Sequence, residues 1–219
     1  MTIGFNRAFY GAFMVTTTFF SGFLTSLALI VPIGAQNAFV LKLGLLRQHV
    51  LVIALLCGFM DAALILLGVT FAGATFGQYG WALLAVKYVG VAFLVVYGCR
   101  AFLNAYRHAQ PMAETPFNQT ITLKTAIATA LGFTLLNPHV YLDTVLLIGG
   151  ISVQYKPHQY DYAVGALMAS FVWFLALGFG ARLLTPLFAK ARTWVVLEVV
   201  IGLLMWSMAY HIWFLPLVL

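Results

Sequence analysis

The sequence predicts an all-α, polytopic membrane protein with six transmembrane helices, and three observations support this fold class. Of the 219 residues, 63% are hydrophobic and only 7% are charged, whereas about 25% of the residues in an ordinary soluble domain are charged. The mean hydropathy is +1.02. The apolar runs are continuous and do not alternate with polar residues, which argues against a transmembrane β-barrel. A soluble fold could not bury this much apolar surface, so the solvent must be the bilayer.

Six apolar stretches are long enough for one span each, because about 20 residues of helix cross the hydrocarbon core. The expected spans cover residues 14–41, 50–73, 82–104, 124–150, 161–184 and 194–214. The first and the fourth are interrupted at Pro32 and Pro138, which predicts two broken helices. A span followed by a re-entrant half-helix remains an open alternative for residues 8–41.

The chain is expected to form a single transmembrane transporter domain made of two inverted three-helix repeats. Repeat one covers about residues 14–106, and repeat two covers about residues 121–214. The polar loop 107–120 separates them. Three spans per repeat give the two halves opposite orientations in the membrane.

Matching positions in the two halves support the repeat. When Pro32 is aligned with Pro138, Gly44 falls within one residue of Gly149. The second and fifth spans also share a glycine, at Gly68 and Gly178. Glycines are common in transmembrane helices, so the proline motifs carry more weight than these matches.

The net charge of +6 comes from 11 basic and 5 acidic residues, and the basic residues gather at the expected helix ends. This distribution indicates membrane topology, not nucleic-acid binding, because no basic patch is interleaved with aromatic residues. One side of the membrane would carry eight basic residues: Lys42, Arg47, Arg100, Arg107, Lys124, Arg182, Lys190 and Arg192. The opposite side would carry three: Arg7, Lys87 and Lys156. The positive-inside rule then places the odd-numbered loops in the cytoplasm and both termini outside.

The proline motif of the first half reads IVPIGAQNAFVLKLG over residues 30–44. Pro32 and Gly34 are helix-breaking residues, since proline removes a backbone donor and glycine adds backbone freedom. The side chains of Gln36 and Asn37 could bind either end of an amino acid. The alternative is that they only form hydrogen bonds between helices.

The second motif reads LNPHVYLDTVLLIGG over residues 136–150. Asn137 is a good N-cap and Pro138 suits the first helical position, so a half-helix is expected to start here. His139 and Asp143 share a helix face and could relay protons or meet a cationic group, with Tyr141 nearby. Two such interruptions at matching places are typical of a transport site at the bilayer midplane.

Asp61 lies at the centre of the second expected span. A carboxylate at mid-bilayer indicates a functional site, and its expected roles are binding a cationic substrate or carrying a proton. A structural hydrogen bond or an ion pair to another helix is the alternative. Glu198, in contrast, is expected near the interface beside Arg192, as a snorkelling or dipole-pairing group.

Other classes of function lack their motifs. The chain contains no Gly-rich phosphate loop, no HExxH and no GxSxG, so ATP-driven transport by this chain alone is not expected. Cys57 and Cys99 show no metal-ligand spacing and are expected to be small buried apolar side chains. We therefore expect no enzyme, no cofactor, no metal and no nucleic-acid partner.

The run PIGAQNAFVLKLGLLRQH together with ALLCGFMDAALILLG and LNPHVYLDTVLLIG resembles the lysine exporter (LysE) family, and most closely its arginine-exporter branch. The resemblance covers nearly the whole chain beyond about residue 20. One departure is Ala35, where the family often carries proline. The resemblance implies a multi-pass exporter of basic amino acids in the bacterial inner membrane, driven by an ion gradient.

The expected function is export of L-arginine by proton-coupled antiport, with L-lysine and canavanine as alternative substrates. The substrate-binding residues would be Gln36, Asn37, Asp61, Asn137, Tyr141 and Asp143. Protons would move on Asp61, Asp143 and His139. Membrane lipid is the expected surrounding, and a homodimer is possible for a chain of this size. The open alternatives are an exporter of a neutral amino acid or of another cationic solute, a passive channel, and an intramembrane lipid-modifying enzyme that uses His139 and Asp143.

Overall fold

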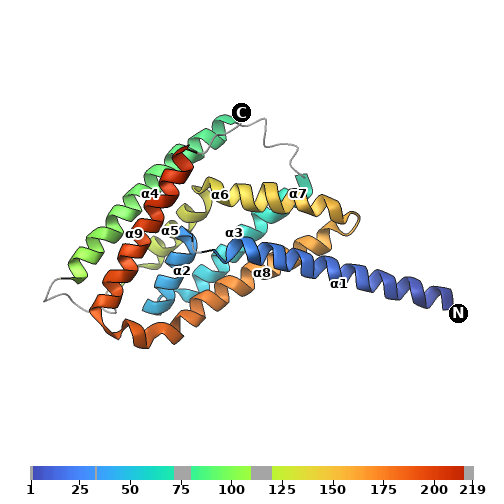
Figure 1. Cartoon of the computed structure of the whole chain (residues 1–219), viewed down its shortest axis with the longest axis horizontal. Helices are drawn as coiled ribbons and strands as arrows, with labels where there is room; N and C mark the ends of the chain where they lie inside the picture. Colours follow the sequence, from blue (N-terminus) through green and yellow to red (C-terminus); the bar gives the residue numbers. More distant parts are fainter. Residues whose placement is uncertain (1, 33, 72–79, 110–119, 215–219) are drawn as a thin grey trace. The chain divides into compact units, whose positions relative to one another are not determined.

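The computed structural model describes residues 2–32, 34–71, 80–109 and 120–214, and every regular element in these ranges is helical (Figure 1). The elements in chain order are α1 (Thr2–Ile30), α2 (Ala35–Leu46), α3 (Val50–Phe71), α4 (Gly80–His108), α5 (Leu123–Leu135), α6 (Pro138–Tyr141), η3 (Leu142–Ile148), α7 (Gly149–Ser152), η4 (Val153–Tyr155), α8 (Gln159–Gly180), η5 (Ala181–Ala189) and α9 (Ala191–Phe214). Most of the predicted loop 107–120 lies outside the described residues.

Five helices are long and apolar enough to span a membrane, and a sixth span results if α5 and the segment after it are counted together. The prediction of a multi-pass helical membrane protein is therefore confirmed. The helix of the first span differs from the expected range, because α1 begins at Thr2 and ends at Ile30. Pro32 cannot donate to the helix ladder and disfavours helical backbone in the residue before it. The chain after it forms the separate 12-residue helix α2.

The fourth span is also divided. Helix α5 ends at Leu135, α6 begins at Pro138, and the two segments are bent by 59°. Beyond Tyr141 the chain continues as the π-helix η3. Thr122 caps the start of α5, with its side chain accepting a hydrogen bond from the Thr125 N–H, as expected for a helix that begins at the end of a polar loop.

Two compact units divide the chain, and each draws segments from both halves of the sequence. Unit 1 contains residues 1–32, 58–76 and 140–173, and unit 2 contains residues 33–57, 77–139 and 174–219. Helices α3 and α8 each contribute one part to each unit. The units are described separately below.

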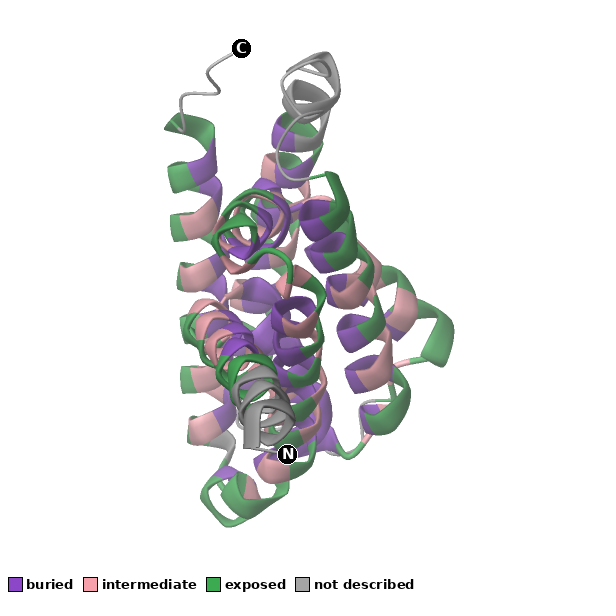
Figure 2. Cartoon of the chain, turned by 90° about the vertical axis from the view of Figure 1, so that its right-hand side faces the viewer, coloured by how far each residue is buried: buried purple, intermediate pink, exposed green. Residues whose placement is uncertain are grey.

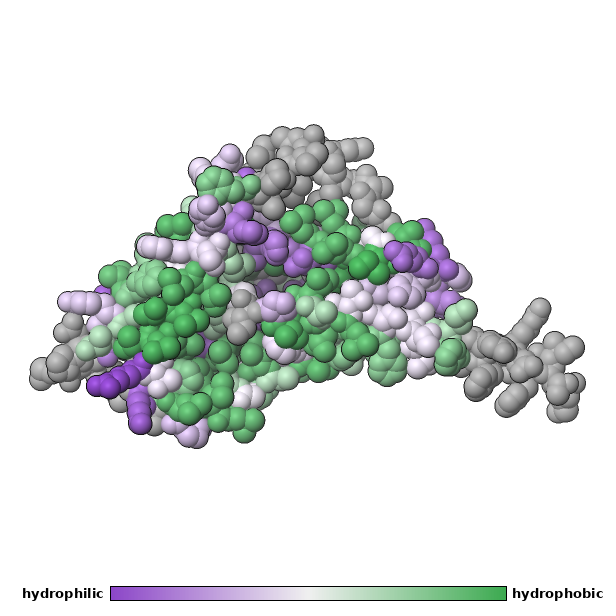
Figure 3. Space-filling model, in the orientation of Figure 1, coloured by the Kyte–Doolittle hydropathy of each residue, from purple (hydrophilic) through white to green (hydrophobic). Residues whose placement is uncertain are grey.

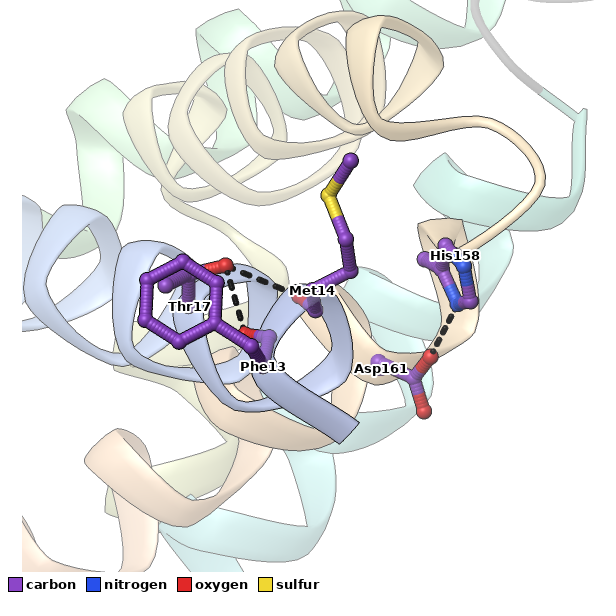
Figure 4. A network of polar contacts seen from close by, with 5 residues as sticks. All are labelled: Phe13, Met14, Thr17, His158 and Asp161. Carbon is purple, nitrogen blue, oxygen red and sulfur yellow. Dashed lines mark hydrogen bonds and ion pairs between the residues drawn. The ribbon is translucent and has the colours of Figure 1, made fainter. Parts of the chain in front are cut away.

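The core of unit 1 forms where α3, α8 and the segment around η3 pack together. Its buried residues are Ile65, Val69, Ile148, Tyr162, Ala163 and Ala166. Helix α1 approaches α8 through glycines: a Cβ on Gly22 would collide with the Tyr162 carbonyl, and one on Gly165 with the Phe19 carbonyl. At the start of α8, His158 Nδ1 lies 3.0 Å from Asp161 Oδ2, and on α1 the Thr17 hydroxyl donates to the carbonyls of Phe13 and Met14 (Figure 4).

In unit 2, α4 and α9 lie side by side (Figure 1). Four rings from α2, α4 and α5 form an aromatic cluster of Phe39, Phe93, Tyr97 and Phe133, with centroids 4.7 to 6.3 Å apart. A second group, which we call the apolar cap, consists of Leu45, Leu46, Ala181, Phe188 and Trp194. Helix α2 is buried along almost its whole length. Its Phe39 packs in the aromatic cluster, and its Lys42 donates a hydrogen bond to Glu198 of α9.

The helices bury one face and expose another, as Figure 2 shows by the alternation of buried and exposed positions. Many of the exposed positions carry large apolar side chains. Most of the surface in Figure 3 is hydrophobic, with hydrophilic residues confined to patches. Such a surface suits a lipid environment. Cys57 is buried as expected, whereas Cys99 is exposed, which corrects the expectation for that residue.

Candidate functional site

The start of α2 in unit 2 lacks a side-chain cap and carries buried amide side chains. Gly34 occupies the N-cap position and makes no side-chain cap, so N–H groups of the first turn have no partner inside the helix. Gln36 and Asn37 in that turn are both buried. The Gln36 Nε2 amide has no hydrogen-bond partner among the described residues. A buried unsatisfied donor at a helix N-terminus is suited to bind a carboxylate.

The start of α6 is capped as predicted, since the His139 N–H donates to Asn137 Oδ1 at 3.1 Å and Pro138 is the first helical residue. The side chain of His139 lines a pocket of about 60 Å³ together with Met208, His211 and Ile212 of α9. The Met208 methyl group also lies 3.9 Å from the place where a Cβ on Gly34 would stand. The starts of α2 and α6 therefore meet the same segment of α9 within unit 2.

Replacing Asn137 with Ala is expected to destabilise the protein by about 1 kcal/mol, because the first turn of α6 loses its side-chain cap. The variant should also transport more slowly, since His139 is held by that cap. Thermal unfolding in detergent and uptake into liposomes would measure both effects. Asn137→Ser is the matched control, since serine also caps helices, and equal loss in both variants would contradict a capping role.

Asp61 is buried in unit 1 with only 4% of its surface exposed. The Ser170 hydroxyl of α8 lies near enough to interact with its carboxyl group, and no basic side chain of the described residues forms an ion pair with it. A carboxylate taken out of water without a paired cation is costly in a membrane. A protein that retains one there has the means to bind a cation or a proton.

The second acidic residue, Asp143, lies in the π-helix η3, where it is half-buried. π-Helical turns inside α-helices occur frequently at functional sites. The backbone of η3 touches α3 closely: a Cβ on Gly68 would lie 2.7 Å from the Val145 Cα. Gly68 is two helical turns, about 10 Å, beyond Asp61 on the same face of α3. Unit 1 therefore brings the helices of both aspartates into contact.

Ten sequence-predicted residues are divided between the two units. Unit 1 holds Pro32, Asp61, Tyr141 and Asp143, and unit 2 holds Gly34, Gln36, Asn37, Asn137, Pro138 and His139. The acidic groups thus belong to one unit, and the amides with the two helix starts belong to the other. The segment 137–143 links them along the chain, because it carries Asn137 and His139 at its beginning and Asp143 at its end.

Two expectations about charged residues are wrong. Lys42 is not an exposed residue at a helix end: it is buried within α2 and forms an ion pair with Glu198 of α9, with Nζ 2.5 Å from Oε1. Glu198 is likewise buried instead of lying at the interface beside Arg192. Removing Lys42 from the count of topology-determining residues changes the predicted bias from eight-to-three to seven-to-three.

Sequence reasoning missed several groups. Ser170 beside Asp61 carries no sequence signal, because serine is ordinary in a membrane helix. The aromatic cluster takes its rings from three helices that lie far apart in the chain, so no local pattern indicates it. The partner of Glu198 lies 156 residues away in the chain, beyond the reach of any local pattern.

The comparisons with known proteins agree with the helical membrane architecture. The profile of the LysE type translocator family matches residues 27–214. A putative amino-acid transporter, YggA, of Aeromonas salmonicida is 42% identical over 204 residues, which cover 91% of the chain and 96% of the relative. Arginine exporter protein ArgO of Klebsiella pneumoniae is 38% identical over 198 residues, covering 90% of the chain and 93% of the relative. The protein of the same name from Salmonella paratyphi A is 38% identical over 196 residues.

No solved structure matches the chain. The family match covers well over half of the sequence, and these relatives are aligned over nearly their full length. The chain belongs to the LysE type translocator family, and it is a multi-pass membrane transporter, not an enzyme.

Proposed function

We propose that the chain exports basic amino acids, L-arginine first, across the bacterial inner membrane in exchange for protons. The observation that carries the substrate class is Asp61, a buried carboxylate inside a membrane span with no paired cation among the described residues. A guanidinium or ammonium group supplies the charge that this environment lacks. The relatives named arginine exporters support the same substrate.

The two ends of an amino acid match two kinds of groups in the chain. The α-carboxylate suits the start of α2, where no side chain caps the helix and the Gln36 amide has no partner among the described residues. The cationic side chain suits Asp61 and Asp143. Asn37, Asn137 and Tyr141 would complete the substrate contacts through their amides and phenol.

Proton exchange follows from the energetics of moving a cation outward. Moving one positive charge out against a negative interior costs roughly 2.3 kcal/mol per 100 mV. One proton moving inward cancels that electrical work. If the substrate and the proton compete for the carboxylate of Asp61 or Asp143, their movements are coupled, and His139 would relay the proton.

Matching glycine contacts support the two inverted repeats. In unit 1, a Cβ on Gly149 would lie 2.5 Å from the Gly68 carbonyl oxygen; in unit 2, a Cβ on Gly44 would collide with the Gly178 carbonyl. Gly44 falls within one residue of Gly149 when the two proline motifs are aligned, and Gly68 and Gly178 are the glycines that the second and fifth expected spans share. Each unit thus packs the helix after one proline motif against the second long helix of the other half.

The composition of the units supports the same repeats. Unit 1 contains α1, the part of α3 from Gly58 on, the segment after Pro138 and the first part of α8. In the proposed repeats, α1 corresponds to α5 of unit 2, and the part of α3 from Gly58 on corresponds to the last part of α8. The segment after Pro138 corresponds to α2, and the first part of α8 corresponds to the first part of α3. Opposed repeats of this kind, broken at Pro32 and Pro138, provide the framework for alternating access.

Counterflow in liposomes holding the purified chain tests the proposal. With radiolabelled arginine, lysine, leucine and citrulline, we expect rapid exchange of arginine, with lysine as the second basic substrate. Leucine and citrulline should stay at the level of empty liposomes, because neither carries a cationic side chain. Movement of leucine alone would overturn the substrate class, and flux of all four without a gradient requirement would indicate a channel.

A further inference from the structure

One end of unit 2 contains the buried ion pair of Lys42 and Glu198, which has no role in the proposed transport mechanism so far. Lys42 lies in the C-terminal half of α2, and Glu198 lies in the N-terminal third of α9. His108 in the last turn of α4 is also buried and lies within electrostatic range of both. Residues 47–49, residues 120–122 and η5 lie at this end, which we call the loop end of unit 2.

The ion pair lies beside two groups of packed side chains. Leu41 and Leu197, the chain neighbours of the pair, pack against the apolar cap defined above. Phe39 of the aromatic cluster precedes Lys42 by three residues and therefore shares its helix face. Tyr97 of the same cluster lies within electrostatic range of Glu198. The pair thus lies where an aromatic layer and an apolar layer of unit 2 come together.

Further hydrogen bonds connect the segments at the loop end. The Ile121 N–H donates to Gln48 Oε1 at 2.8 Å, and His49 Nε2 lies 2.8 Å from the Ile121 carbonyl oxygen. The Trp194 indole donates to the Phe188 carbonyl at 2.9 Å. The connections at this end are therefore tied to each other and to the apolar cap.

Stability alone does not account for a buried Lys–Glu pair. Desolvation of the two charges offsets most of their attraction, and well-packed apolar side chains often replace such a pair without loss of stability. A buried pair is better suited to a switch, because its two groups can be exchanged for other partners. The Lys42 ammonium group belongs to the same chemical class as the cationic end of a basic amino acid, and a guanidinium binds a carboxylate with two parallel hydrogen bonds.

We propose that Glu198 is a further acceptor for the cationic side chain of the substrate and that Lys42 occupies it when no substrate is bound. The pair then acts as a latch on the loop end of unit 2. An arriving guanidinium takes over the carboxylate, Lys42 is released, and the layers on either side of the pair can separate. This inference deepens the proposed function and rests on it for the identity of the substrate.

Lys42→Met tests the exchange of cations directly. The variant leaves Glu198 buried without its ammonium partner, so it should be less stable than the wild type. Arginine and methylguanidinium should raise its unfolding temperature more than they raise that of the wild type, because they supply the missing cation. Citrulline, which is neutral, should not. Lys124→Met, which removes an exposed lysine at the start of α5, is the matched control.

Lys42→Met/Glu198→Met provides a second test that does not require the single variant to fold. The double variant carries no unpaired charge and should be at least as stable as the wild type. If the pair is a latch, arginine counterflow should nevertheless fall by about tenfold or more, in the range of ordinary coupling between sites. Wild-type counterflow in the double variant would overturn the proposal.

The outcomes separate the latch from the proposed function. If wild-type protein exchanges arginine but neither cation rescues Lys42→Met selectively, the latch is wrong and the exporter stands. If wild-type protein exchanges no basic amino acid while methylguanidinium still rescues Lys42→Met, Glu198 is a cation acceptor and the proposed substrate is wrong.

Discussion

Asp61→Asn is expected to abolish proton-driven arginine export while leaving the protein folded. Asparagine has nearly the volume of aspartate and can still interact with the Ser170 hydroxyl. It has no carboxyl group that can bind and release a proton, so it cannot couple substrate movement to a proton gradient, whereas Asp143 can still bind the substrate cation. Arginine efflux from proteoliposomes with an imposed proton gradient would measure the loss. Exchange of arginine for arginine, which needs no proton, should be less affected.

The control for this variant is Asp161→Asn, which makes the same change in the same unit. Asp161 lies at the start of α8, where it contacts His158 and is partly exposed (Figure 4). An exposed ion pair of this kind contributes little to stability, and we expect gradient-driven efflux to remain near the wild-type rate. Full efflux from Asp61→Asn would remove Asp61 from the coupling mechanism.

The spans were the most predictable part of the fold, because continuous apolar runs of about 20 residues leave little choice of environment. The cap at Asn137 was predictable for a different reason, since an N-cap residue followed by proline is a strong local signal for a helix start. The start of α1 was not predictable, because residues 2–13 are mixed in polarity and helix length depends on packing as well as propensity.

Lys42 shows what local reasoning could not provide. A lysine near the end of an apolar run is ordinarily a topology-determining residue at the membrane surface. Whether it is instead buried depends on an acid elsewhere, and Glu198 is 156 residues away. The opposite holds for Asp61, which needed no partner to be recognised, because any carboxylate at mid-span is unusual.

The glycines shared by the two halves of the sequence could be interpreted only from their contacts in the structure. In the sequence, Gly44 with Gly149 and Gly68 with Gly178 are weak correspondences between two halves. In the structure, Gly149 touches Gly68 and Gly44 touches Gly178, so each pair marks a close helix crossing. Small residues permit such crossings because they let the backbones approach.

Gly149→Ala is therefore expected to impair both folding and transport. Its new Cβ would lie 2.5 Å from the carbonyl oxygen of Gly68 and 2.9 Å from its Cα. These are backbone atoms that cannot turn away, so the two helices must separate. Overpacking of this kind costs about 1–3 kcal/mol. The separation also shifts η3, which carries Asp143, from α3, which carries Asp61, so arginine counterflow should fall together with the unfolding temperature.

Gly150→Ala is a closely matched control, since it makes the same change one residue later in the same helix. A Cβ at Gly150 meets no atom within 4 Å, so this variant should be as stable as the wild type or slightly more stable, because alanine favours helix. If both variants lost activity equally, the cause would be the lost backbone flexibility of Gly149 and Gly150, and not the helix crossing at Gly68. If only Gly149→Ala loses activity, the crossing of α7 and α3 at Gly149 and Gly68 is what holds the two acidic residues in working positions.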